Sequence, residues 1–462
     1  MSFWDNILNN LPEVAGPEQK RLSFKEKLKW TGVILAFFFI LGMIPLFGLG
    51  ANALQQFEYL SLILGAKFGS LISLGIGPIV TSSIVLQLLN GSGIVKFDLN
   101  TQEGKKRFQG IQKLLAIFFV FFESIVYVFM GGLAPAPELV GTTMYFYMQL
   151  VLIFQLIVGG MMILFMDEVV SKWGFGSGIS LFIAAGVSQE VFIKALSPLR
   201  SPANPSAYTG AIPEFLRALS IGDPVTATLM LAAVISTIVV FVMAVYGQAM
   251  KVEIPLSFGR IRGHGIRWPL SFMYTSNIPI ILIAALMANV QLWARLLEHW
   301  GRPWLGTFSG NMPVSGIVTW FYSPDIVGNI IKGSLSRSDI MHGIAYMLIM
   351  VVGAVIFSIF WVQTSGMDAK SQAKQIMASG LQIPGFRRDE RVLERLLNRY
   401  IWPLTVMGAI AVGVLAGVAD LTGSLSRGTG ILLAVMIIYR LYEDIAKQHM
   451  MDMHPMMRKF ME

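Results

Sequence analysis

The chain of 462 residues has no cysteine, only five histidines, and charged residues make up just 13% of it. Without cysteine it can form neither disulfides nor thiolate metal sites, and we predict no metal centre. The sequence also lacks a phosphate-binding P-loop, an HExxH zinc motif and a credible nucleophile triad. These absences argue against an enzyme, and no cofactor is predicted.

Apolar residues, by contrast, make up 55% of the chain, and its mean hydropathy is +0.64. This composition is typical of a membrane protein that crosses the bilayer many times. Runs of about 20 apolar residues predict ten membrane-spanning helices in an all-α fold. These runs lie near 30–47, 71–89, 110–130, 143–166, 177–195, 227–246, 272–296, 340–362, 401–418 and 429–441.

The ten predicted spans form two halves, 30–195 and 227–441, separated by an external hinge loop at 196–226. With five spans in each half, the second half enters the membrane in the opposite sense, as in an inverted repeat. If residues 1–29 are cytoplasmic, most of the 35 Lys and Arg residues fall on the cytoplasmic side. This satisfies the positive-inside rule. We therefore predict that the N-terminal segment and the tail 442–462 are both cytoplasmic.

The apolar run 51–89 is interrupted by several glycines and by Pro78. Its first part, 57–64, is too short to cross a bilayer, so we expect a short helix held inside protein. Broken helices at membrane depth are tolerated only where protein or a water-filled cavity satisfies the freed backbone groups. We therefore expect this segment to pack against other protein or to line a water-filled cavity.

Glu123 is the one charged residue that lies well inside a predicted span. Charges at membrane depth are costly and often functional. Glu123 either makes a contact between helices that can be broken and remade, or a structural hydrogen bond that fixes their packing. Asn289 and Thr81 are candidate partners. A single carboxylate also argues against an ion-coupled transporter, which would carry several ionisable groups through its interior.

Two aliphatic pairs, Ile76 with Val80 and Ile179 with Ile183, are each spaced four residues apart. Each pair therefore shares one face of its helix. Such pairs usually face lipid or a neighbouring helix. A hydrophobic constriction that excludes water would need the same residues, however, so both interpretations stay open.

Two predicted cytoplasmic loops, about 249–270 and 364–399, are long and basic. The arginines of interest are Arg260, Arg262 and Arg267 in the first loop and Arg387 and Arg388 in the second. Orientation by the positive-inside rule explains some of this charge. The alternative is docking to a polyanion, because arginine suits contacts with phosphate groups.

Five motifs, in order along nearly the whole chain, resemble the SecY family, the channel subunits of the Sec protein translocon. They are Gly75-Ile76-Gly77-Pro78-Ile79-Val80-Thr81, Gly174-Phe175-Gly176-Ser177-Gly178-Ile179-Ser180, Ser276-Asn277-Ile278-Pro279-Ile280-Ile281, Ile383-Pro384-Gly385-Phe386-Arg387 and Gly428-Thr429-Gly430-Ile431-Leu432-Leu433. The residues of these motifs resemble those of archaeal members, and through them the eukaryotic α subunit, more than those of bacterial members.

The resemblance implies two five-helix halves around a central pore, an aliphatic ring that closes it, and a short plug helix at about 52–70. By motif, the ring residues would be Ile76, Val80, Ile179, Ile183, Ile281 and Leu433. The plug would contain Phe57, Leu60, Ile63 and Leu64. Thr81, Glu123 and Asn289 would hydrogen-bond across a lateral gate formed by the spans that begin near 71, 110, 272 and 340. The arginines named above would dock to the ribosome.

The implied function is a protein-conducting channel of the cell membrane with no catalysis of its own. Unfolded secretory polypeptides would cross it, and signal peptides and transmembrane segments would leave sideways into the lipid bilayer. SecE-like and Secβ-like small subunits and the ribosome are the implied partners. Two alternatives stay open: a secondary transporter, which needs a polar site at the midplane, and a scaffold subunit, which has no need of aliphatic residues converging from four helices.

Overall fold

A helix lies at each of the ten predicted positions in the computed structural model, which describes residues 10–18, 22–52, 66–91, 94–95, 97, 101–200, 206–258, 265–275, 278–309, 312–378, 381–382, 389–426 and 428–453. These helices are α2 (Phe24–Met43), α4 (Gly77–Gly91), α5 (Gln102–Phe129), α6 (Thr143–Trp173), α7 (Gly178–Leu196), α9 (Pro224–Ala249), α10 (Ile278–His299), α12 (Arg337–Thr364), α14 (Glu390–Leu421) and α15 (Gly428–Met453). Seven helical stretches among the described residues are long and apolar enough to cross a membrane. They involve α5, α6, α7, α9, α10, α12 and α14, so the count of ten spans stays a prediction.

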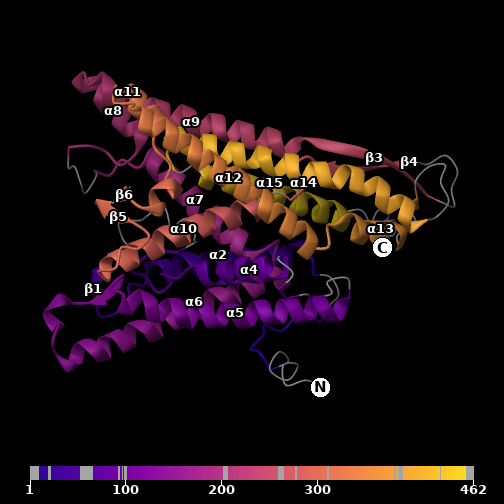
Figure 1. Ribbon diagram of the computed structural model, residues 1–462, viewed down its shortest axis with the longest axis horizontal. Helices are drawn as coiled ribbons and strands as arrows, with labels where there is room; N and C mark the ends of the chain where they lie inside the picture. The colour runs from indigo at the N-terminus through magenta and orange to yellow at the C-terminus, as the bar shows by residue number, and fades with distance from the viewer. Residues whose placement is uncertain are drawn as a thin grey trace.

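Short elements lie between the long helices. Four antiparallel pairings among the described residues make three small sheets. They join β1 (Leu49–Asn52) to β2 (Leu133–Pro135), β5 (Thr307–Ser309) to β6 (Met312–Ser315), and β3 (Lys251–Phe258) to both β4 (Gly265–Ser271) and β7 (Leu381–Gln382). The short helices are η1 (Pro137–Leu139), α8 (Ala211–Ile221), η2 (Ile317–Phe321), α11 (Ile326–Ile331) and α13 (Ala369–Ala378). The β3–β4 hairpin extends from one end of the bundle, whereas α8, α11 and the β5–β6 pair lie at the other (Figure 1).

The long helices form two groups. Helices α2, α4, α5 and α6 lie on one side and α9, α12, α14 and α15 on the other, with α7 and α10 between them (Figure 1). Helix α4 packs against α5, α10 and α12, and α15 packs against α7, α9 and α14. The largest buried apolar cluster draws side chains from both groups. The core of the protein therefore lies where the two groups meet.

Contacts between distant segments define one end of this bundle. Lys27 Nζ at the start of α2 donates to Gln448 Oε1 on α15 over 3.1 Å. Trp173 Nε1 at the end of α6 donates to the carbonyl oxygen of Ala15 over 2.9 Å. The N-terminal residues and the last turns of α15 thus share an end, as an even number of spans requires. We call this the tail end and the opposite one, which holds α8, the loop end.

The segment before α4 consists of turns, although the apolar run 71–89 predicted a helix there. Gly75 has a φ of +54°, which side-chain-bearing residues rarely adopt, and Pro78 lies in the first helical turn, where its missing N–H leaves no bond unmade. Hydrogen bonds from outside the segment satisfy its backbone: Leu71 N–H donates to the Ile44 carbonyl oxygen over 2.9 Å. The glycines and proline therefore delay the start of the helix to Gly77 and place Ile76 at the boundary of α4.

A close approach of α6 holds these turns in place. A Cβ atom on Gly159 would lie 1.8 Å from the carbonyl oxygen of Leu71, so no larger residue fits without a shift of the backbone. Gly159 lies within α6 and is buried. The turns before α4 are thus clamped between α6 and the end of α2.

Candidate functional site

The six predicted ring residues lie in the core where α4, α7, α10 and α15 come together. Ile76, Val80, Ile183, Ile281 and Leu433 belong to one buried apolar cluster, and Ile179 packs against it. The neighbouring Leu432 belongs to the same cluster and also lines a groove between α9 and α14, which Leu433 does not. Aliphatic residues from the start of α4 and from α7, α10 and α15, far apart in sequence, thus lie in or against one buried apolar cluster, which also contains aromatic and methionine side chains. We call these six residues the aliphatic cluster.

A cavity of about 430 Å³ lies on the tail side of this cluster. Val80, Ile179 and Ile281 line the cavity, whereas the fully buried Ile76, Ile183 and Leu433 do not. The rest of the wall includes the polar side chains Ser83, Gln87, Gln112, Arg440 and Asp444. The aliphatic cluster therefore forms an apolar floor beneath a cavity whose walls are partly polar.

The three predicted gate residues meet although they come from three helices. Asn289 Nδ2 on α10 donates to Thr81 Oγ1 on α4 over 3.1 Å. The Thr81 hydroxyl in turn donates to Glu123 Oε1 on α5 over 3.4 Å, which is long for such a bond. Glu123 and Asn289 are buried, yet the second carboxylate oxygen of Glu123 meets no donor in the described part of the chain. One hydroxyl thus links three helices, and the link is weak.

An aromatic pair also connects α5 and α10. The rings of Phe122 and Trp293 stack with their centroids 5.8 Å apart. Phe122 is 40% exposed, so this contact lies at the outer surface of the bundle. Stacked aromatic pairs contribute about 0.5–1.5 kcal/mol beyond the area that they bury. The seam between α5 and α10 is therefore closed by a polar link inside and an aromatic contact outside, and spacing in the sequence gives no sign of the latter.

Asp420 is a second buried carboxylate, which the predicted span 401–418 leaves out because α14 continues to Leu421. Tyr346 Oη on α12 donates to Asp420 Oδ2 over 2.5 Å, and the backbone N–H of Thr429 donates to Oδ1 over 2.7 Å. The Thr429 hydroxyl donates to the same carboxylate. Thr429 lies one helical turn before Leu433. Asp420 therefore joins α12 and α14 to the part of α15 that carries a predicted ring residue.

The remaining predicted site residues fall largely outside the described part of the chain. These are Phe57, Leu60, Ile63 and Leu64 of the plug and Arg260, Arg262, Arg387 and Arg388 of the docking loops. The backbone of Arg267 lies in β4, opposite Pro255 of β3. Among the described residues, no group of three or more acidic or histidine side chains is placed to hold a metal ion.

Comparison with known proteins decides the family. A model of the SecY family matches residues 70–442. The chain belongs to the SecY family. The protein translocase subunit SecY of Methanothermobacter thermautotrophicus is 46% identical to it over 463 residues, which cover 99% of this chain and 98% of that relative.

Solved structures of SecY-type channels share the fold. A structure described as a protein-conducting channel has a TM-score of 0.83 and 44% identity, and the match covers 97% of this chain and 98% of that one. A SecY structure whose plug domain is described as stabilising the closed channel has a TM-score of 0.82 and 43% identity over the same shares. Sec61 in the canine ribosome-channel complex has a TM-score of 0.80 and 43% identity, also with 97% and 98% covered. The predicted class of fold, a helical membrane protein of the SecY type, is confirmed.

We predict that Tyr346→Phe and Asp420→Asn are energetically coupled. Tyr346→Phe removes the hydroxyl that donates and Asp420→Asn removes the charge of its acceptor, so both act on the same buried bond. The double variant should therefore lose less stability than the two single variants combined, with a coupling of about 0.5–3 kcal/mol. Unfolding of the purified proteins in detergent measures this cycle. Tyr400→Phe is the matched control, because Tyr400 is 39% exposed on α14 and should add independently to Asp420→Asn. Strict additivity of the first pair would show that the bond contributes nothing.

Proposed function

We propose that this chain forms a passive channel through which unfolded polypeptides cross the membrane, with a gate that releases apolar segments sideways into lipid. The aliphatic cluster that closes the cavity between α4, α7, α10 and α15 is the observation that carries this proposal. It is supported by the relatives, one named a protein translocase subunit and another described as a protein-conducting channel.

The ring is assigned to Ile76, Val80, Ile179, Ile183, Ile281 and Leu433, which lie in or against the buried cluster. Aliphatic side chains offer no hydrogen bonds, so a narrow constriction of them excludes water and ions when it is closed. They also bind no particular side chain strongly, which lets unrelated sequences pass. A seal and a passage that accepts many sequences thus follow from the same residue type.

The lateral gate is assigned to the seam between α5 and α10, with α4 and α12 beside it. The polar link through Thr81 holds the seam with one bond of ordinary length and one long one. Opening therefore breaks few polar bonds, although apolar side chains of α5 and α10, among them Val128 and Leu292, also pack in one buried cluster. An apolar signal segment that enters the seam would replace the Phe122 to Trp293 contact with its own side chains and then move into lipid, which dissolves apolar helices.

The docking surface is assigned to the loops 249–270 and 364–399. The described parts of both loops join in one sheet, because Ser257 pairs with Gln382 and Phe258 with Leu381. The strands that precede the two arginine-rich segments, β3 and β7, therefore lie side by side, so both loops would bring positive charge to the same region for contact with a ribosomal RNA backbone. Sec61 in a ribosome-channel complex supports this assignment.

Further parts of the proposal rest on the family. A plug at about 52–70 is supported by the SecY structure with a plug domain. SecE-like and Secβ-like subunits would complete the assembly, and a partner such as the ribosome would supply the work, since the chain itself is assigned no catalysis. We place the protein in the cell membrane with both termini cytoplasmic. The pairing of Lys251 Nζ on the hairpin with Glu443 Oε1 on α15, over 2.9 Å, puts the basic hairpin beside the tail on one side.

Replacing Ile76 and Ile183 together with serine should raise the ion conductance of the resting channel at least severalfold, because hydroxyl groups allow water to enter the constriction. Single-channel recording in planar bilayers measures this leak. Ile79→Ser is the control, since Ile79 is also buried in α4 and belongs to the same apolar cluster, but its side chain lines a different cavity between α4, α5 and α6. A silent double variant, or an equal leak in the control, would contradict the ring assignment.

Thr81→Val should let the channel accept less hydrophobic signal sequences. The change keeps the shape of the side chain but removes the hydroxyl that Asn289 and Glu123 share in the closed gate. This destabilises the closed gate by about 1–3 kcal/mol. That cost shifts the equilibrium towards the open gate by about 5- to 150-fold. Insertion of a graded series of signal sequences measures the threshold.

The control for this prediction is Ser82→Ala. The Ser82 hydroxyl is fully buried one residue away, but it donates to the Ile79 carbonyl oxygen of its own helix over 2.7 Å and links no other helix. Its loss should leave the threshold unchanged. If Thr81→Val and Ser82→Ala behaved alike, the polar link would have a packing role only.

A further inference from the structure

Helix α8 turns a charged side chain inward and an apolar face outward, which is the reverse of a helix on a surface that faces water. The carboxylate-bearing Glu214 is only 4% exposed, whereas Ile212, Leu216 and Leu219 are 41%, 61% and 57% exposed. The three apolar residues are spaced four and three apart, so they share one face of the helix. A surface helix normally turns its apolar face inward and its charges outward. The outward face of α8 therefore needs an apolar cover.

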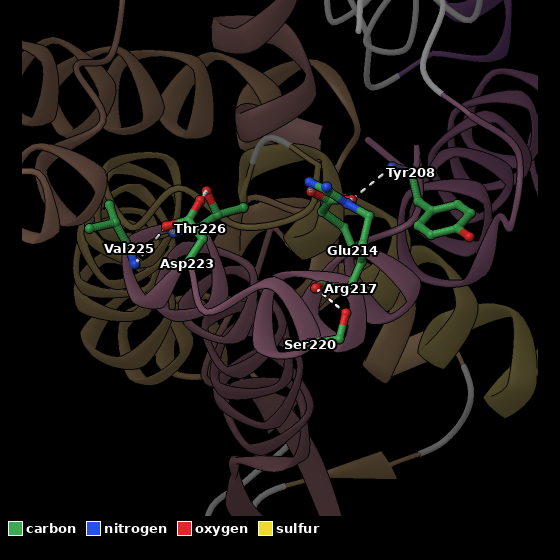
Figure 2. Close-up of polar contacts among 7 residues, drawn as sticks. All are labelled: Tyr208, Glu214, Arg217, Ser220, Asp223, Val225 and Thr226. Atoms are coloured by element: carbon green, nitrogen blue, oxygen red, sulfur yellow. Dashed lines mark hydrogen bonds and ion pairs between the residues drawn. The ribbon is translucent and has the colours of Figure 1, made fainter. Parts of the chain in front are cut away.

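The charge on the inner side of α8 is fully engaged within the protein, as Figure 2 shows. Arg217 Nε donates to Glu214 Oε2 over 2.8 Å, the backbone N–H of Tyr208 donates to the same oxygen over 2.7 Å, and a second Arg217 nitrogen donates to Oε1. The Arg217 guanidinium lowers the pKa of Glu214, so the pair stays charged near neutral pH. The Arg217 bonds lie within α8, and the bond from Tyr208 ties Glu214 to the loop before the helix. Ala211 and Ala218 are buried on the same side as Glu214, so the apolar face is directed outward.

Both ends of α8 are held at the level where membrane-spanning helices end. At its start, Gly210 N–H donates over 3.0 Å to the carbonyl oxygen of Ser197, which caps the end of α7. At its other end only Gly222 and Asp223 separate it from α9, and the Asp223 side chain caps α9. Eleven residues of helix are about 16 Å long. Helix α8 thus bridges the ends of two spans and lies close to the plane that these ends define.

The surroundings of the apolar face indicate lipid as its cover. Helix α8 packs against α9, whose first turns expose further apolar side chains, among them Val225 and Leu231 at 47% and 44%. The apolar surface of α8 therefore adjoins that of a span. Residues 211–223 carry one positive and two negative side chains, so their net charge gives no attraction to a polyanion or to anionic headgroups. Apolar contact is the one attractive term that this face offers.

We propose that α8 is an interfacial helix that lies on the membrane surface at the loop end, with Ile212, Leu216 and Leu219 inserted at the boundary between headgroups and acyl chains. It would anchor to lipid the connection between the first five predicted spans and the last five. This assignment depends on neither the ring nor the gate.

Site-directed spin labelling tests the proposal directly, because a chain without cysteine needs no background mutations. Single variants Ile212→Cys, Leu216→Cys and Leu219→Cys are labelled with a nitroxide in the full chain and reconstituted in phosphatidylcholine vesicles. Collision rates with oxygen, which concentrates in lipid, and with a water-soluble nickel chelate report the depth of each label. Thr209→Cys, on the exposed residue before α8, is the water reference. Ile238→Cys, on the exposed face of α9, is the reference for deep lipid.

All three α8 labels should give oxygen-to-nickel collision ratios several times that of the Thr209 label and below that of the Ile238 label. Because the face carries no net positive charge, adding anionic phosphatidylglycerol should leave these depths unchanged. Nickel accessibility equal to that at Thr209 would show that the face is in water. Shielding of the labels from both oxygen and nickel would show that protein, such as a second copy, covers it, and either result would overturn the proposal.

Discussion

The hydrocarbon core of a membrane supplies no water to the backbone, so the chain can leave the helical state there only where other protein groups take over its hydrogen bonds. The turns before α4 show how this constraint is met. The Ile44 carbonyl oxygen accepts from Leu71 N–H, the Ser73 hydroxyl accepts from Gly69 N–H over 2.9 Å, and the bare Gly159 backbone lets α6 approach. Because these turns are held so firmly, α4 begins at a fixed depth, and Ile76, Val80 and Thr81 follow at its start.

From that fixed start, one helix takes part in two opposite kinds of contact. On one face Ile76 and Val80 join an aliphatic cluster that provides only non-directional contact, which suits a seal that must let any sequence through. Beside them Thr81 makes directional bonds to α5 and α10, of which the one to α5 is long, and so small a set suits a seam that must part and close again. Asp420, by contrast, is held by three bonds from two helices and keeps α15 in place. Rigid and breakable polar links are thus separated in space.

The sequence was sufficient to predict the membrane class, the family and the channel function, because apolar run length and ordered motifs depend on local sequence alone. It also predicted that Thr81, Glu123 and Asn289 meet. It did not reveal the Phe122 to Trp293 stack, the role of Asp420 or the outward apolar face of α8, because each depends on contacts between distant segments. The β3–β4 hairpin lies in a region predicted as a loop. Apolar residues alternate along β3 from Val252 to Phe258, but Pro255 within that run argues against a strand. The roles of the plug residues and of the docking arginines stay predictions.

The central claim is that polypeptide passes between α4, α7, α10 and α15. It is tested most directly by a photo-crosslinking side chain placed at Ile281 while a secretory chain is stalled in transit, with Ile238 on the exposed face of α9 as the control position. The stalled chain should crosslink at Ile281 and not at Ile238. A chain shown to be in transit that crosslinks at neither position, or equally at both, would contradict a passage through this ring.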